Sequence, residues 1–166
     1  MSRDGLEFVR LQALYRGRLG VEVGVFVAVD HLRRADRLTE VEEELYFGID
    51  DWFQEHLPNP PFYDDGNSIG AVTWFKRQSS AGMVQRLTPL CDILTKYGVP
   101  WVAAQSADPG AVVYEDQFQI GVIPYVRHDP SPPPPGLVLG ATTSGSKRQF
   151  GKKARAAATD VAAPDA

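Results

Sequence analysis

The chain has 166 residues, of which 43% are hydrophobic and 10% aromatic, and its formal net charge at pH 7 is −4. This length predicts one domain with an extension rather than two domains, and the composition is that of an ordinary globular protein. The chain has no apolar run near the roughly 18 residues of a membrane helix, no apolar signal segment in MSRDGLEFVR and only one cysteine, so we expect a cytoplasmic protein without disulfides or a membrane partner.

The first two β-type segments, residues 6–15 and 21–29, flank a turn at 16–20, which predicts a hairpin. Every second residue of the latter segment is valine, and most of the residues between the valines are apolar too. A strand with two apolar faces is typical of the covered centre of a sheet. We therefore predict that residues 21–29 form a buried strand that ends at Asp30.

Thr39 and Glu42 form a capping-box pattern, which predicts a helix that runs to about Leu57, ahead of Pro58. Helical spacing divides its side chains into two arcs. One arc is acidic and has Phe47 at its centre, so we expect Phe47 to be exposed. The other arc is apolar and should face the core; it holds Val41, Leu45, Tyr46, Ile49, Trp52, Phe53, His56 and Leu57.

After this helix, a stiff proline-rich loop at 58–68 precedes a predicted strand at 69–76. A second helix is predicted over 80–97, in which Pro89 marks a kink or a fresh start capped by Thr88. Segments 101–105 and 111–123 are the last predicted strands. The resulting order, ββ-α-β-α-ββ, predicts a two-layer α/β (α+β) sandwich with two main helices on one face of a mixed sheet of about five strands. Its strand–helix–strand crossovers favour some parallel pairing.

The composition changes near residue 128, where a proline-rich segment leads into a tail of Gly, Ser, Ala and basic residues. We predict one globular domain over 5–127 and a disordered linker and tail over 128–166. Residues 131–166 carry five basic and two acidic side chains, so residues 1–130 carry 12 basic and 19 acidic ones. An acidic body repels phosphate, and any contact with nucleic acid would therefore involve only the tail.

The acidic arc of the first helix suggests a partner surface, in which Glu43, Asp51 and Glu55 surround Phe47. An exposed aromatic ring with a charged rim is typical of a binding anchor, and the acids would attract a basic protein. The leading hypothesis is therefore a small bacterial-type interaction module, inhibitor-like or immunity-like, rather than an enzyme.

The alternative is a small enzyme or ligand-binding domain whose pocket lies at the 58–68 loop. Tyr63 and Trp74 would line that pocket. Its acid–base groups, which would also suit a metal-dependent hydrolase, would be Asp64, Asp65, Asp116 and Lys76. A simpler explanation is that the loop acids shape a turn and that Asp116 pairs with Arg10, Lys76 or Arg77. Histidine spacings typical of metal sites are absent, so we expect neither a metal nor a cofactor.

Overall fold

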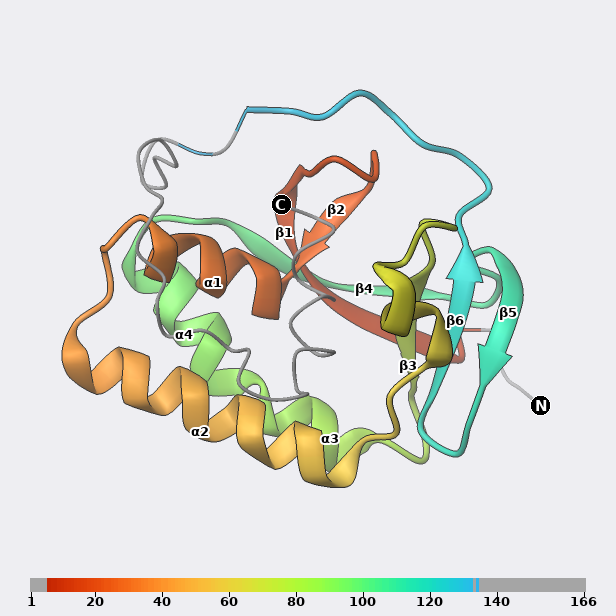
Figure 1. Ribbon diagram of the computed structural model, residues 1–166, viewed down its shortest axis with the longest axis horizontal. Helices are drawn as coiled ribbons and strands as arrows, with labels where there is room; N and C mark the ends of the chain where they lie inside the picture. The colour runs from red at the N-terminus through yellow and green to blue at the C-terminus, as the bar shows by residue number, and fades with distance from the viewer. Residues whose placement is uncertain (1–5, 133, 135–166) are drawn as a thin grey trace.

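The computed structural model describes residues 6–132 and Pro134 (Figure 1). These residues form an α+β fold that fits the predicted two-layer sandwich, with a six-stranded sheet and the helices grouped beside it. The predicted basic cluster of the tail lies outside the described residues. The elements in chain order are β1 (Phe8–Arg16), β2 (Glu22–Gly24), α1 (Val25–Arg34), α2 (Glu40–His56), the 3-10 helix η1 (Pro61–Asp65), β3 (Val72–Lys76), α3 (Ala81–Arg86), α4 (Thr88–Lys96), β4 (Trp101–Ser106), β5 (Ala111–Glu115) and β6 (Gln119–Ile123).

The sheet is built around β1, which pairs with β2, β3 and β4, while β6 and β5 extend it beyond β3. Every pairing between the described strands is antiparallel, so the expected parallel pairing is wrong. The crossover from β2 through α1 and α2 leads to β3, which pairs with β1 and β6 rather than with β2. Successive strands around a helical crossover are therefore not neighbours here, and the rule that makes such neighbours parallel does not apply.

The predicted buried strand at 21–29 is also wrong, because only Glu22–Gly24 is a strand and Val25 opens α1. Almost every residue of α1 is buried, including the polar residues Asp30, His31 and Arg33. A helix that is covered on all sides needs apolar residues all round, as a central strand does on its two faces. A short apolar run does not distinguish the two, and here packing in the core overrides the β preference of valine.

The capping box at the start of α2 is confirmed. The Thr39 hydroxyl accepts a hydrogen bond from the Glu42 amide at 3.1 Å, and the Glu42 carboxylate accepts one from the Thr39 amide at 2.8 Å. That carboxylate also accepts bonds from Lys96 and Tyr97, each at 2.6 Å, which ties α2 to the end of α4. Burial raises the pKa of Glu42, but the bonds from Lys96, Tyr97 and Thr39 outweigh it and lower the pKa to about 2.

Two predicted segments are divided in the structure. The predicted helix at 80–97 is broken at Leu87 into α3 and α4, so Pro89 marks a fresh start, with Leu87 rather than Thr88 in the cap position. The predicted strand at 111–123 is a hairpin, because β5 ends at Glu115 and β6 begins at Gln119. Asp116 therefore lies in a turn and not on a strand face.

The C-terminal contacts with the domain continue past the predicted boundary at 127. The amide of His128 donates to the Gly20 carbonyl at 2.8 Å, and Ser131 exchanges hydrogen bonds with the backbone of Arg16 at 2.7 and 3.2 Å. The Arg16 side chain also donates to the Asp129 carbonyl at 2.9 Å. Residues 128–131 therefore hold the turn between β1 and β2.

This contact predicts a difference between two truncations. A chain that ends at Arg127 should be less stable than one that ends at Pro132, by about 1–3 kcal/mol, because it loses four hydrogen bonds of modest net strength. Urea unfolding of the two chains, compared at equal temperature and pH, measures this difference. Equal midpoints would contradict the view that residues 128–131 belong to the domain.

None of the helices in the described part of the chain is long and apolar enough to cross a membrane.

Candidate functional site

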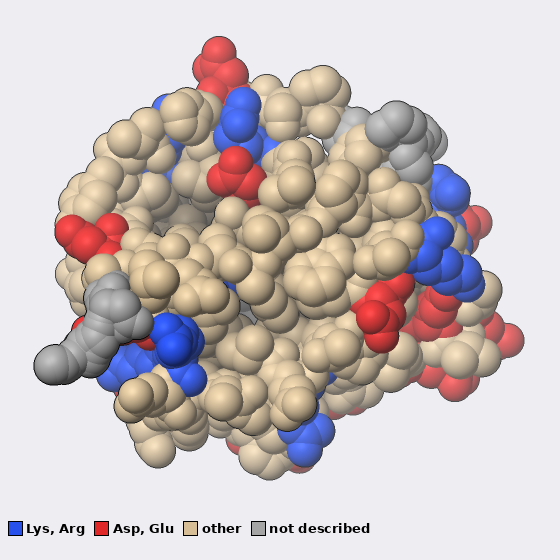
Figure 2. Space-filling model, turned by 180° about the vertical axis from the view of Figure 1, so that it is seen from behind, with Lys and Arg blue, Asp and Glu red and all other residues tan. Residues whose placement is uncertain are grey.

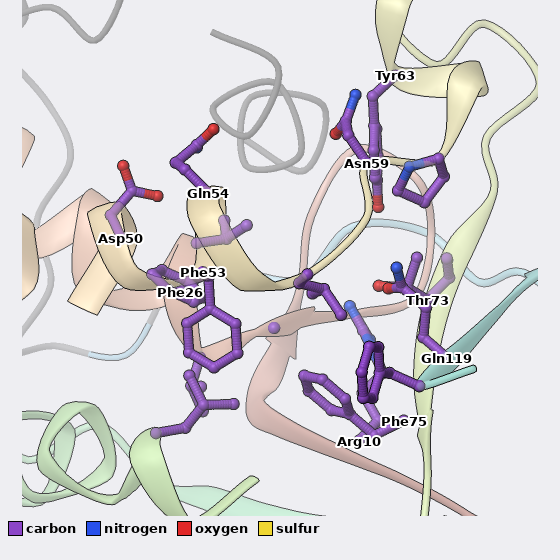
Figure 3. Close-up of a pocket in the computed structure, with 18 of the residues that line it drawn as sticks. Arg10, Phe26, Asp50, Phe53, Gln54, Asn59, Tyr63, Thr73, Phe75 and Gln119 are labelled. Atoms are coloured by element: carbon purple, nitrogen blue, oxygen red, sulfur yellow. The ribbon is translucent and has the colours of Figure 1, made fainter. Parts of the chain in front are cut away.

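A cavity of about 490 Å³ lies between the helices and the sheet, beneath the loop that follows α2 (Figure 3). The strands β1, β3 and β6 form one side, and α1 with the C-terminal half of α2 forms another. The loop after α2 and η1 complete the wall. The predicted location, at the 58–68 loop, therefore holds a pocket. The residues that line the cavity include Arg10, Phe26, Tyr46, Asp50, Phe53, Gln54, Glu55, Asn59, Tyr63, Thr73, Phe75 and Gln119.

Aromatic rings form much of the cavity wall. Phe26 from α1 meets Tyr46 and Phe53 from α2 edge to face, with ring centroids 5.9 and 5.6 Å apart. Phe53 in turn lies 6.4 Å from Phe75 on β3. Because Tyr46, Phe53 and Tyr63 are buried in this packing, the wall is a fixed part of the core rather than a loose surface groove.

The loop over the cavity is held by local chemistry that the sequence suggests. Pro60 and Pro61 lead into η1, which ends at Gly66 with a φ of 81°. The Asn67 side chain then accepts from the Ala71 amide at 2.8 Å and donates to the Ala71 carbonyl at 2.9 Å. These bonds satisfy a buried amide and a buried carbonyl, so the loop has a defined shape.

The loop is fastened to the sheet at Gly121. A β-carbon at this position would lie only 2.6 and 2.7 Å from two atoms of the Phe62 ring. Phe62 also meets Tyr114 edge to face, with centroids 6.3 Å apart. Glycine at 121 thus lets Phe62 rest on the sheet and close one end of the loop.

We expect Gly121→Ala to destabilise the domain by about 1–3 kcal/mol, because the added methyl must displace the Phe62 ring. Gly48→Ala on α2 is the matched control, since a β-carbon there meets nothing within 4 Å. The control should gain about 0.5–1 kcal/mol from the better helix propensity of alanine. Thermal unfolding of both variants checks the prediction, and similar shifts for the two would contradict it.

Asp116 is the centre of a hydrogen-bond network next to the cavity. Its carboxylate accepts bonds from the Tyr114 hydroxyl at 2.6 Å and from the amides of Phe118 and Gln119 at 2.7 and 3.1 Å. The Gln119 side chain donates to it at 3.0 Å and to the Pro58 carbonyl at 2.9 Å. Burial raises the pKa of Asp116, but the bonds from Tyr114, Gln119 and the amides outweigh it and hold the pKa below its ordinary value. This carboxylate therefore stays ionised and shapes the hairpin.

The candidate catalytic residues are not brought together. Lys76 pairs with Glu115 at 2.5 Å, and Asp64 accepts a long bond of 3.4 Å from Asn59. The predicted pairing of Asp116 with Arg10, Lys76 or Arg77 is also wrong, because its carboxylate is bound by Tyr114, Phe118 and Gln119. Of the residues predicted to line the pocket, Tyr63 does so and Trp74 does not. The four predicted acid–base residues Asp64, Asp65, Asp116 and Lys76 make no bond to one another and lie outside the lining.

Among the described residues, no group of three or more His, Cys, Asp and Glu side chains could hold a metal ion. The acids that do line the cavity are Asp50 and Glu55.

The expected orientation of α2 is wrong by part of a turn. Tyr46 and Phe53 face the core, whereas Val41, expected in the core, is 72% exposed. Phe47, expected to be exposed, is half-buried, with its ring 5.2 Å from the Tyr46 ring and 5.3 Å from the Arg33 guanidinium. The α2 helix adopts this rotation about its axis because Phe26 and Arg33 of α1 pack against Tyr46 and Phe47.

Trp52 is half-buried rather than fully buried, since His56 stacks on its ring and the Arg86 guanidinium lies over it. Of the acids around Phe47, Asp51 and Glu55 are exposed and Glu43 is half-buried. Binding of a partner by Glu43, Phe47, Asp51 and Glu55 stays a prediction.

Charged side chains are unevenly placed on the face turned away from the viewer of Figure 1. Figure 2 shows that uncharged side chains cover most of its middle, while Lys, Arg, Asp and Glu lie mainly towards its rim. A basic stripe of the kind that follows a nucleic-acid backbone is not seen on the described part of this face.

The sequence did not identify the cavity residues of β1, α1 and β6, such as Arg10, Phe26 and Gln119. The signal in the sequence was the loop at 58–68, whose acidic and aromatic residues suggested a pocket and which contributes Tyr63 to the lining. Comparisons of the chain with protein-family models, with curated proteins and with solved structures found no match.

Proposed function

We propose that this domain binds a small, largely aromatic molecule in the cavity beneath the 58–68 loop. The observation that carries the proposal is the cavity itself, whose volume of about 490 Å³ is within the usual range for ligand sites. Aromatic rings from α1, α2 and β3 would contact a flat apolar ligand. A few polar groups, among them Arg10, Asp50 and Gln119, would orient it.

Binding is favoured over catalysis by the chemistry around the cavity. Asp116 is held ionised by several donors, and Lys76 is engaged by Glu115. The cavity wall is mostly apolar, and its polar groups come from separate elements rather than from a linked set of acid, base and nucleophile. A non-enzymatic binding domain fits this arrangement better than a hydrolase does.

The experiment is an amide-resolved NMR titration with indole, a two-ring aromatic probe. We expect saturable shifts confined to lining residues such as Thr73, Phe75 and Gln119, with a dissociation constant of about 1 mM or below. Thr73→Phe should fill the cavity from β3 and weaken the affinity for indole at least about tenfold, or ~1.4 kcal/mol.

Val102→Phe is the matched control, because it also adds a ring to a strand but lies outside the cavity, at a position that is 40% exposed. This variant should bind indole as the wild type does. Shifts scattered over the surface, or equal affinities in the two variants, would refute the proposal.

Binding of a basic protein through α2 is a second candidate. It is favoured by Val41 and Leu45, which are 72% and 40% exposed on the same helix as the exposed acids Glu40 and Glu44. An apolar patch beside acids suits a basic partner. Affinity capture from the native cell should then retain a protein that is released by salt and is lost with Leu45→Asp but not with Thr73→Phe. Identical eluates from wild type and Leu45→Asp would contradict it.

A further inference from the structure

Gln119 places a buried polar group beside the aromatic rings of the cavity wall (Figure 3). It is the first residue of β6, it lines the cavity, and it is only 3% exposed. On the sheet it pairs with Phe75, whose ring belongs to the same wall. A side-chain amide buried to this degree normally has its donors and its acceptor satisfied by hydrogen bonds.

The surroundings of Gln119 fix which way its amide points. Its Nε2 donates to the Pro58 carbonyl at 2.9 Å and to the Asp116 carboxylate at 3.0 Å. Both partners are acceptors, since Asp116 is ionised and a carbonyl has no hydrogen to give. Rotating the amide by 180° would set its oxygen against two other oxygens, so only one orientation fits the network.

The oxygen of the Gln119 amide, Oε1, has no such partner among the described residues. In the part of the chain that the structure describes, Oε1 of Gln119 accepts no hydrogen bond, and it is not among the atoms sealed from solvent without a partner. Because the residue itself is nearly buried and lines the cavity, the opening at Oε1 is the cavity. The wall therefore presents a fixed hydrogen-bond acceptor inside a pocket that several aromatic rings line.

Thr73 adds a polar group from the neighbouring strand to the same wall. It lies two residues from Phe75 on β3, so its side chain is on the Phe75 face of the sheet, diagonal to Gln119. Its hydroxyl makes no hydrogen bond to another described residue. A hydroxyl both donates and accepts, so it adapts to a ligand, whereas Oε1 of Gln119 only accepts.

We propose that the cavity selects a planar aromatic ligand that carries an N–H or O–H group, which donates a hydrogen bond to Oε1 of Gln119. This inference rests on the proposed binding function and adds the chemical class of its ligand. A flat molecule without such a donor would cover the oxygen and leave it unpaired, and that penalty makes a polar group in an apolar pocket selective. Gln119 is then the residue that determines specificity, and Asp116 and the Pro58 carbonyl position it.

The test compares two probes of the same two-ring shape, indole and 1-benzothiophene, in which sulfur replaces the N–H group. Benzothiophene is the more apolar compound, so apolar burial alone would favour it. We expect the wild type to bind indole at least about fivefold more tightly in calorimetric or NMR titrations. Gln119→Met has nearly the same shape without the amide, and it should reduce the preference to less than about twofold.

Gln117→Met is the matched control, because Gln117 is exposed in the same hairpin turn and lies outside the cavity. It should keep the wild-type preference for indole. If Gln119→Met does not fold, the comparison of the two probes in the wild type still decides the question. Equal affinities there would overturn the ligand class while leaving the cavity a binding site. Binding of neither probe would overturn the proposed function, and the ligand class with it.

Discussion

Replacing Asp30 with alanine should lower the free energy of unfolding by about 3–5 kcal/mol, the usual cost of breaking a buried ion pair from one side. Asp30 is 1% exposed and accepts a hydrogen bond from the Arg33 Nε at 2.8 Å. It also forms ion pairs with Arg33 at 2.6 Å and with Arg34 at 2.8 Å. Arg33 is itself only 7% exposed. Its guanidinium would remain in the core after losing the carboxylate that balances its charge.

Equilibrium unfolding in urea measures this loss, and Asp92→Ala is the control. Asp92 lies on α4 and is exposed, so its removal should change the stability by less than about 0.5 kcal/mol. The double variant Asp30→Leu, Arg33→Met should recover much of the loss, because an apolar pair of similar size can replace a buried ion pair. A loss below about 1 kcal/mol for Asp30→Ala would show that the core tolerates Arg33 without the Asp30 carboxylate.

The parts of the fold that the sequence predicts well are those set by local chemistry. The capping box of Thr39 and Glu42 fixes the start of α2 through bonds between neighbouring residues, and Pro58 limits its end. The loop after it has a defined shape because proline restricts its backbone. Such features require no knowledge of what the rest of the chain contributes.

Features that depend on distant residues were not predictable in this way. Whether 25–34 becomes a strand or a helix depends on the space left by β1 and α4, because its valines suit either form. The rotation of α2 depends on Phe26 and Arg33, which lie one helix earlier. Periodicity identifies the arc of a helix that carries apolar residues. The arc that becomes buried depends on the element against which the helix packs.

The candidate site likewise combines residues that the local sequence indicates with residues that it does not. Tyr63 was placed at the pocket because it belongs to the loop, but Gln119 comes from β6, about sixty residues away in the chain. Its role depends on Asp116. That residue lies in a hairpin turn, within a segment whose sequence pattern resembles a single strand. A hairpin turn of Asp-Gln-Phe has no glycine or proline to mark it, and the carboxylate of Asp116 instead satisfies the turn amides.

His31 should make the domain sensitive to mild acid. It is 4% exposed, the Tyr15 hydroxyl lies 2.6 Å from its Nδ1, and its Nε2 is buried without a hydrogen-bond partner among the described residues. Burial lowers its pKa from 6.5 to about 4; Asp30 opposes this shift and Arg34 adds to it. Between these two values the unfolded chain binds a proton that the folded chain does not bind. Stability from this residue is therefore fully present above pH 6.5 and declines as the pH falls towards 4.

We expect this histidine to cost the wild type roughly 3 kcal/mol between pH 7 and pH 4, since each unit of pKa shift corresponds to about 1.4 kcal/mol. His31→Asn is the variant to compare, because its amide can meet the Tyr15 hydroxyl and does not titrate. Urea unfolding at intervals across this range gives the difference in stability between the two proteins. That difference separates the effect of His31 from the effect of carboxylates such as Glu42. Because the pKa of Glu42 is about 2, its protonation destabilises both proteins equally and at lower pH. The stability of the wild type relative to His31→Asn should fall steadily below pH 6.5. Parallel stability curves for the two proteins would show that His31 is already protonated in the folded core.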